Sequence, residues 1–492
     1  MEWIELYSDV DGSEQLSYVV PMEALDQLLH PNYEQVEREQ QKWLRSKVQQ
    51  ALCEKYGDCP AQGILQRFQW ELERIEHLNM AGEVLFLREL VKMVHEAGGE
   101  TFIGGTWGSS FLVYLLGITE LNPLPPELDS EGFDLCPMSL LGTDKPQTFA
   151  EIHLPGKLIP LIKEKTEQLY GKRMMELYCA AINLEDAVET QDTLNQCYPP
   201  TELEALGAFC QEIRQHREPV SYNPDWPWLY LVPEEKNLSA IPAVLSGSED
   251  AVWLVTDHPM WLSHVPSIHL ADGLVQSALN LCAQRTGVRS NEIPLDDEKL
   301  YALLCKVFEN HEAESPVAKA CKTVGLEVDG YLSEVFRIMN VGDIHSLSRM
   351  ISLAHGTAVW FGNQQQMIEN GSMNPAQLIT CREDVYRYLM RCGAAHTEAL
   401  SFMQDVGRGD ICRKGYTDLQ LNVLKECQIE DWFIQVCKKI DYLFPEAHCV
   451  QLAANLVQLI WYIQQDPEAI PIVLNAYDAY LEVCNAYSDV DE

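Results

Sequence analysis

Basic residues are scarce in this 492-residue sequence. Lysine and arginine number 35 against 74 aspartates and glutamates, which gives a formal net charge of −39. Proteins that bind nucleic acid gain affinity by placing cations on phosphates and releasing counterions, so this balance opposes nucleic-acid binding unless the cations gather locally. An excess of acid also keeps many cytoplasmic proteins soluble, and the charge alone does not decide between the two explanations.

Long apolar runs and paired cysteines are also missing. No run approaches the roughly 18 apolar residues that a membrane-spanning helix needs. The sixteen cysteines form no C-x-x-C pair, and the closest two, Cys53 and Cys59, are six positions apart. Membrane insertion, a disulfide framework and a zinc knuckle are therefore not expected. The acidic N-terminus lacks the basic and apolar regions of a signal peptide, so we expect a cytoplasmic protein.

Apolar residues are plentiful, at 47% of the sequence, and suffice for the cores of roughly two to four domains. Their spacing predicts two amphipathic helices over residues 62–99 and another helix over 158–170. Residues 228–232 and 251–256 have the pattern of buried strands. From residue 273 onward the pattern is all helical.

A stretch rich in small residues, GGTWGSS at positions 104–110, leads directly into an apolar run. Gly104, Gly105 and Gly108 permit backbone conformations that residues with a Cβ atom resist. Ser109 and Ser110 can cap a helix or hold an anion such as phosphate. The local pattern therefore fits both a plain helix start and a phosphate-binding turn.

Three separated segments resemble the PolC-type DNA polymerase III alpha subunit of Gram-positive bacteria. Residues 117–126, GITELNPLPP, are similar to the family's G-I-T-E-V-N-P-L-P-P. Residues 352–371, SLAHGTAVWFGNQQQMIENG, resemble its S-H-G-T-x-V-W-x-G-N segment. Residues 438–448, KKIDYLFPEAH, resemble its K-K-I-x-Y-M-F-P-K-A-H. The motifs keep the family's order, and the resemblance covers most of the chain.

The resemblance implies an α+β fold that is mostly helical, with a polymerase-β-like nucleotidyltransferase palm, an inserted helical thumb and all-helical fingers. The family's upstream exonuclease and phosphoesterase domains have no counterpart here, so proofreading is not expected. The expected segments are an acidic N-terminal extension (1–50), a first part of the palm (51–157), a thumb-like helical insertion (158–217), a second part of the palm (218–275), a fingers-like helical domain (276–480) and an acidic tail (481–492).

Catalysis in the resembled family depends on three aspartates that hold two divalent cations. Two of them lie in a P-D-I-D-L strand, where this sequence reads FAEIHL at 149–154 and places Glu151 and His153. The third lies in K-L-D-I-L-G, matched by SIHLAD at 267–272, which places His269 there. Mg²⁺ demands near-octahedral oxygen ligation, and imidazole replaces a bridging carboxylate poorly. The resemblance therefore implies that no intact set of catalytic residues remains.

A second interpretation of the same residues is a different metal site. Glutamate with histidine suits Zn²⁺ or Fe²⁺, and His153 and His269 are expected to face each other across paired strands. Histidines in such positions more often make structural hydrogen bonds, so we predict no metal and no cofactor, with Mg²⁺ relevant only to a residual activity. The family's cluster of zinc-ligating cysteines is reduced to Cys136, so we predict no zinc site there either.

The resemblance also assigns residues that would meet phosphates. Gly108, Ser109 and Ser110 are what remains of the nucleotide-phosphate loop, whose arginine is lost. Two lysines of the family give way to Asp441 and Glu446, which would turn attraction for phosphate into repulsion. The fingers motif keeps six of its residues: His355, Gly356, Thr357, Lys438, Lys439 and His448.

The leading hypothesis is a catalytically inactive pseudo-polymerase that acts as a binding or regulatory protein. The expected partner is an unknown protein, and a partner with a basic surface would complement the acidic chain. Nucleic-acid binding is expected to be weak or absent. The competing hypothesis is a DNA polymerase or nucleotidyltransferase-like protein with residual or altered metal-dependent activity. A third hypothesis is that the chain binds primer–template without catalysis. It requires the basic residues at 157–173 and 337–349 to line one groove.

Overall fold

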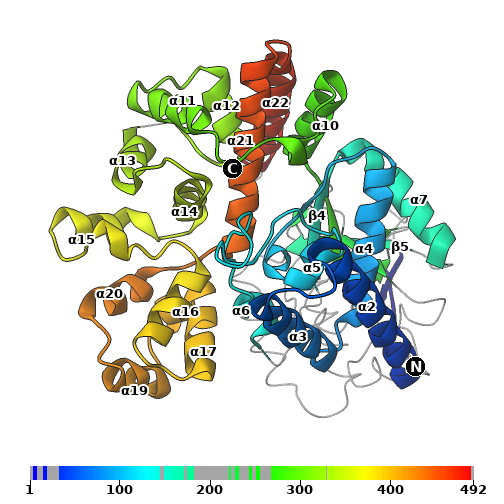
Figure 1. Cartoon of the computed structure of the whole chain (residues 1–492), viewed down its shortest axis with the longest axis horizontal. Helices are drawn as coiled ribbons and strands as arrows, with labels where there is room; N and C mark the ends of the chain where they lie inside the picture. The colour runs from blue at the N-terminus through cyan, green and yellow to red at the C-terminus, as the bar shows by residue number, and fades with distance from the viewer. Residues whose placement is uncertain are drawn as a thin grey trace.

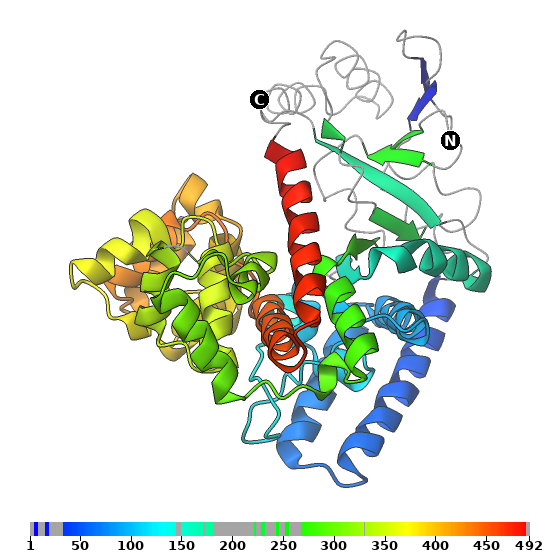
Figure 2. The same ribbon diagram turned by 90° about the horizontal axis from the view of Figure 1, so that it is seen from above.

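The structure is a computed structural model in which two halves flank one long helix, α21 (Glu446–Gln465) (Figure 1). We call residues up to 272 the sheet half and residues from 273 the helical half. Figure 2 shows α21 between them. The residues that the structure describes are 33–143, 149–170, 267–328 and 330–488, together with seven strand segments at 4–7, 15–18, 174–181, 221–222, 228–231, 243–245 and 251–254.

The sheet half is built on one mixed sheet, with strand order β3-β4-β10-β7-β5-β9-β8 and β6 paired to β5. β4 and β10 run parallel, as do β5 and β9, and the other neighbours are antiparallel. The strands predicted near 228 and 251 are confirmed. The bounds are β3 (Phe102–Ile103), β4 (Phe149–Leu154), β5 (Met174–Ala181), β6 (Ser221–Tyr222), β7 (Trp228–Leu231), β8 (Ala243–Leu245), β9 (Ala251–Leu254) and β10 (Ser267–Asp272), with β1 (Ile4–Tyr7) and β2 (Gln15–Tyr18) forming a separate antiparallel pair.

Helices pack on this sheet through apolar faces. The predicted helical pair over 62–99 is confirmed as α3 and α4, and the apolar side of α3 is buried through Ile64, Phe68, Leu72 and Ile75, whose spacing follows the helical period. The helix predicted over 158–170 is confirmed as α7. The helices of this half are α2 (Tyr33–Tyr56), α3 (Gln62–His77), α4 (Ala81–Glu96), α5 (Phe111–Leu115), α6 (Met138–Leu141) and α7 (Ile159–Tyr170).

Two of the expected segments do not coincide with elements of the structure. Helix α2 runs without interruption across residue 50 and buries Leu44, Val48 and Leu52 in the same core, so the N-terminal extension does not end there. The insertion expected to be helical over 158–217 contains strand β5, which lies inside the main sheet between β7 and β9. Residues 182–217, and residues 489–492 of the acidic tail, lie outside the described residues.

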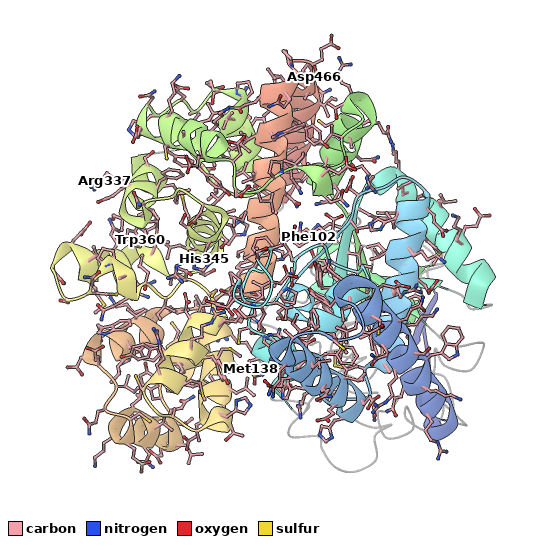
Figure 3. The ribbon with its side chains drawn as sticks, in the orientation of Figure 1. Phe102, Met138, Arg337, His345, Trp360 and Asp466 are labelled. Carbon is pink, nitrogen blue, oxygen red and sulfur yellow. The ribbon has the colours of Figure 1, made fainter. Side chains whose placement is uncertain are left out.

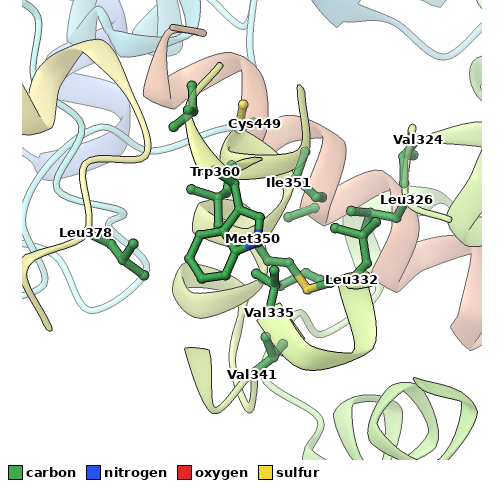
Figure 4. Close-up of a cluster of buried hydrophobic side chains, with 14 of the residues drawn as sticks. Val324, Leu326, Leu332, Val335, Val341, Met350, Ile351, Trp360, Leu378 and Cys449 are labelled. Atoms are coloured by element: carbon green, nitrogen blue, oxygen red, sulfur yellow. The ribbon is translucent and has the colours of Figure 1, made fainter. Parts of the chain in front are cut away.

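The helical half confirms the all-helical pattern predicted from residue 273. Its core is continuous, and Figure 4 shows the part where Trp360 packs near Met350 and Val335. The helices are α10 (Leu274–Thr286), α11 (Glu298–Glu309), α12 (Pro316–Thr323), α13 (Gly330–Met339), α14 (Ile344–His355), α15 (Gln365–Glu369), α16 (Arg382–Arg391), α17 (His396–Gly407), α18 (Asp410–Lys414), α19 (Asp418–Glu426), α20 (Asp431–Lys439), α21 and α22 (Ala469–Ser488).

Helix α21 ties the two halves together. It is buried on almost every side, as expected for a helix whose apolar residues are not confined to one stripe. It packs against α10, α12 and α14 of the helical half and against the 3₁₀ turn Trp107–Ser109 of the sheet half. In the part of the chain that the structure describes, no helix combines the length and apolar character that a membrane span requires.

Candidate functional site

Strand β4 carries Glu151 and His153 on one face, because alternate residues of a strand point to the same side. Glu151 Oε1 contacts His153 Nε2, and the two side chains are 21% and 22% exposed. The His153 ring also stacks on Phe102 of the neighbouring strand β3, with ring centroids 4.7 Å apart and an interplanar angle of 16°. The two residues therefore form a partly covered pair on the sheet surface.

The register of β10 on β4 corrects one expectation about this face. His269 is the register partner of Glu151, and Ala271 is the partner of His153. The pairing is therefore shifted by two residues from the predicted meeting of His153 with His269. The side chain of His269 lies outside the described residues, so its proposed role as a ligand stays a prediction.

The glycine loop, residues 104–110, runs from β3 to α5 beside this pair. Gly104 N donates a hydrogen bond to Glu151 O at 2.7 Å, and a Cβ atom at position 104 would lie 3.2 Å from Glu151 Cβ. Gly105 has a φ of +68° and donates its N–H to His448 Nδ1 at 3.2 Å. Glycine at these two positions thus allows close backbone approach and a left-handed turn.

His448 connects the sheet half to α21. Its ring contacts Phe102, with centroids 5.1 Å apart, and accepts the Gly105 hydrogen bond already described. Burial, with His153 as a second contribution, lowers the pKa of His448 to about 3. A neutral imidazole at this position acts as a hydrogen-bond acceptor, which fits a structural joint.

The serines predicted as a phosphate-loop remnant face inward. Ser110 caps α5, and its hydroxyl donates to Glu71 Oε2 at 2.6 Å. The same carboxylate oxygen accepts the N–H of Leu112 at 3.2 Å. Ser109 Oγ donates to Thr106 O at 2.7 Å. A carboxylate from within the fold therefore takes the Ser110 hydroxyl and the Leu112 amide, which are donors that a phosphate would need, and these hydrogen bonds favour the plain helix start over the phosphate-binding turn.

The remaining loop positions are also part of the core. Gly108 and Trp107 are buried, and a Cβ at position 108 would meet Ala447 of α21 at 3.4 Å. Arg67 neutralises Glu71 and donates from Nη2 to Ser109 O at 2.9 Å and to Leu135 O at 3.2 Å. Sequence reasoning missed Arg67 and Glu71. A glutamate on the otherwise apolar face of α3, four residues after an arginine, is the signal that points to a buried pair.

The two motifs of the helical half lie against each other. Thr357 and Tyr442 form an isolated antiparallel bridge, with Thr357 N donating to Tyr442 O at 3.0 Å. Lys439 Nζ donates to Gly362 O at 2.6 Å. His355 Nε2 lies 2.9 Å from Val324 O. These motif residues hold backbone groups, and both motif lysines, Lys438 and Lys439, are exposed on α20.

Gly356 lies where the two motifs are closest. A Cβ at this position would clash with Val359 Cγ2 and come within 3.1 Å of Tyr442 O. The position therefore requires glycine for space, since its φ is −70° and any residue can adopt that value.

The acidic replacements in the second motif are paired inside the protein. Asp441 accepts a hydrogen bond from Arg413 Nη1 at 2.8 Å, and Glu446 accepts two from Arg387, both at 2.8 Å. Burial raises the pKa of Glu446 to about 7, and the Arg387 guanidinium opposes that shift. The expected repulsion of phosphates by these two residues is therefore weakened, because each carboxylate already has a cation.

The basic residues required for a shared nucleic-acid groove are separated. α7 and α13 lie on opposite sides of the molecule in Figures 1 and 2, and Figure 3 shows Arg337 on the helical half far from Phe102. Arg349 is held by Asp384, at 3.1 and 3.2 Å, and by Leu378 O. Within the described residues, the two basic stretches do not line one groove.

The described residues contain no group of three histidine, cysteine, aspartate or glutamate side chains placed to hold a metal ion. Cys136 is one of the described residues, and burial raises the pKa of its thiol to about 11. A thiol that stays protonated is a poor metal ligand, because the thiolate is the binding form.

Comparison with known proteins gives similarity to PolC-type DNA polymerase III over most of the chain. Residues 42–141 match the bacterial DNA polymerase III alpha NTPase domain. The PolC-type DNA polymerase III of Oceanobacillus iheyensis is 26% identical over 510 positions that cover 93% of this chain and 34% of that protein. That of Staphylococcus saprophyticus is 25% identical over 92% of this chain and 34% of its own length, and that of Caldanaerobacter subterraneus is 24% identical over 84% and 32%.

The chain spans about a third of the length of these curated relatives. The resemblance carried by three short motifs is thus confirmed by similarity that runs through most of this sequence: the chain is PolC-like. Glu151, His153 and the glycine loop lie within the part that the relatives cover.

Proposed function

We propose that this chain is a cytoplasmic pseudo-polymerase. In this proposal, the palm, thumb and fingers scaffold of a PolC-type relative has lost nucleotidyl transfer and serves as a binding or regulatory protein. The proposal includes a protein partner and no resident metal.

The observation that carries the proposal is the pairing of Glu151 with His153 on β4. In the resembled family both positions are aspartates that share two cations. A Mg²⁺ ion here would have to compete with His153 for Glu151 and would find an imidazole where a second carboxylate is needed. The register position opposite Glu151 is again a histidine, His269.

The glycine loop supports the same proposal. A nucleotide triphosphate needs hydrogen-bond donors that point outward, but the Ser110 hydroxyl and the Leu112 amide both donate to Glu71. A fixed carboxylate beside the loop would also repel an incoming phosphate. The residues that would bind substrate in a working relative therefore serve the fold of this chain.

Primer extension tests the proposal directly. The full chain is mixed with a labelled primer–template, all deoxynucleotides and either Mg²⁺ or Mn²⁺, and binding is followed by fluorescence anisotropy at about 50 mM salt, where phosphate contacts are strongest. We expect no extension, and binding that is equally weak with and without metal. Glu151→Gln is the matched control and should behave like the unmodified protein.

Extension that depends on Mg²⁺ and is abolished by Glu151→Gln would overturn the proposal and establish a residual polymerase. A further variant restores the three acids as Glu151→Asp, His153→Asp and His269→Asp. Extension by this variant alone would show that the missing ligands are the sole defect, which is the strongest support for loss of catalysis at this site.

A further inference from the structure

A groove of about 1860 Å³ runs between the two halves. One wall is the loop between α5 and α6, and the other is formed by residues 291–296 before α11, the end of α13, the start of α14, residues 375–379 and α16. Small-molecule pockets occupy roughly 300–1,000 Å³, so this groove has room for a larger ligand such as a peptide segment.

The lining of this groove is strongly acidic. It contains eight carboxylates, three arginines and no lysine. Two of the arginines are already neutralised, since Arg349 pairs with Asp384 at 3.1 Å and Arg387 with Glu446 at 2.8 Å. The third, Arg391, is exposed. A nucleic-acid backbone would be repelled here, whereas a cationic ligand would be attracted.

Open carboxylates lie on both walls. Glu131 and Asp134 are exposed on the loop, and Asp296 is exposed on the opposite wall, as is Asp343, whose Oδ1 also caps α14 by accepting from Ser346. In the part of the chain that the structure describes, none of these four forms an ion pair. Successive side chains of an extended peptide point to opposite sides, so cations at neighbouring positions could reach both walls at once.

A buried amide adds a second, independent feature. Asn122 lines the groove and is 2% exposed, and its Oδ1 accepts the N–H of Leu124 at 3.2 Å. Its Nδ2 has no hydrogen-bond partner among the described residues, although it helps to lower the pKa of nearby Asp129. A buried donor without a partner costs stability, and a peptide carbonyl is an acceptor that would satisfy it.

Apolar side chains complete the lining, among them Pro126, Leu295, Ile344 and Met390, of which Met390 is 37% exposed. We propose that this groove binds an extended segment of a partner protein that is rich in lysine or arginine. The inference rests on the proposed function, because it names the partner chemistry of the inactive scaffold. Backbone hydrogen bonding to Asn122 sets the position of the segment, and the acids on both walls select its charge.

The test uses a fluorescent peptide of about ten residues in which pairs of neighbouring lysines alternate with pairs of alanines, and which spans roughly 33 Å when extended. Its affinity is measured by anisotropy for the unmodified chain and for a groove variant, Glu131→Gln with Asp134→Asn and Asp296→Asn. Asparagine tolerates the positive φ of +53° at position 134. We expect the groove variant to bind about tenfold more weakly.

The matched control removes three exposed acids elsewhere, as Glu73→Gln, Glu309→Gln and Glu327→Gln, so both variants carry the same net charge. We expect its affinity to stay within about twofold of the unmodified chain. Equal weakening in both variants, or no binding of the peptide to the unmodified chain, would overturn the inference.

Asn122→Ala provides a readout that net charge does not affect, and it should weaken binding of the same peptide by several fold through the lost carbonyl contact. Unchanged affinity in this variant would remove Asn122 from the proposal. Primer extension by the same preparations keeps the two ideas apart: a failed peptide test with no extension rejects the groove alone, whereas extension rejects the proposed function.

Discussion

The glycine loop and strand β4 are neighbours, joined through Gly104 N and Glu151 O, but they use their polar side chains differently. In the loop, the Ser110 hydroxyl is buried and donates to Glu71, which is itself fully buried beside Arg67. On β4, the paired side chains stay about one-fifth exposed. Polar groups of the loop have become part of the core, whereas those of the strand have remained on a surface.

The largest predicted effect tests the loop side of this comparison. Glu71→Gln removes the fully buried charge that compensates the partly buried Arg67, so we expect the free energy of unfolding to fall by about 3 kcal/mol in urea denaturation. Lys92 and Glu96 form the same i,i+4 pair on an exposed surface of α4, so Glu96→Gln should cost less than about 0.5 kcal/mol. Equal losses of unfolding free energy in Glu71→Gln and Glu96→Gln would mean that the buried pair contributes no more than the exposed one.

The next effect extends the comparison to the joint between the two motifs of the helical half. Gly356→Ala places a methyl group against Val359 and Tyr442 O, so we expect a loss of about 2 kcal/mol from overpacking. At Gly342 the nearest atom to an added Cβ is 3.8 Å away, and Gly342→Ala should be nearly neutral. Thermal unfolding of both variants measures the difference. Equal melting temperatures would contradict the expected overpacking at position 356.

A smaller effect appears in the pH dependence. His448, faced by Glu151, His153 and His355, has a folded pKa of about 3, while an unfolded histidine titrates near 6.5. The unfolded state therefore binds more protons between these values, and stability falls as pH falls through the window. His448→Asn keeps an acceptor for Gly105 and should reduce the slope by up to about 1.4 kcal/mol per pH unit. If the unfolding free energies of the unmodified protein and of His448→Asn had the same pH dependence, the proposed titration of His448 would be contradicted.

The smallest effect is expected on β4. His153→Ala removes a partly exposed pair and one ring contact, so the unfolding free energy should fall by less than about 1 kcal/mol. Urea denaturation of His153→Ala and Glu71→Gln under the same conditions compares the two losses of unfolding free energy. A loss as large as that of Glu71→Gln would mean that the strand is as tightly built as the loop.

Sequence patterns predicted much of the fold, because the relevant information is local or carried by the family motifs. Apolar spacing identified α3, α4 and α7, and the strand patterns near 228 and 251 were sufficient for β7 and β9. The motif resemblance is supported by similarity across most of the chain. Thr357 and Tyr442 also show that two of these motifs meet in space.

The features that the sequence analysis missed or predicted wrongly involve residues whose contact partners lie far away in the sequence. Glu71 lies 39 positions before Ser110, and no local pattern shows that its carboxylate occupies the start of α5. The register that pairs His269 with Glu151 depends on how two strands meet whose partner residues are 118 positions apart, and a register shift of one residue changes every partner. Strand β5 was missed because its neighbours in the sheet, β7 and β9, follow it by dozens of residues.

The contact between Gly105 and His448 joins positions 343 residues apart, and α21 supplies it from late in the chain. During synthesis, the sheet half must wait for residues 446–465 to leave the ribosome before the glycine loop finds its final neighbours. The entropy of closing so long a loop grows only logarithmically with its length, so the delay affects the rate of assembly more than the final stability. We expect a nascent chain halted before α21 to expose the α21-binding surfaces of both halves, and chaperones would meet it in that state.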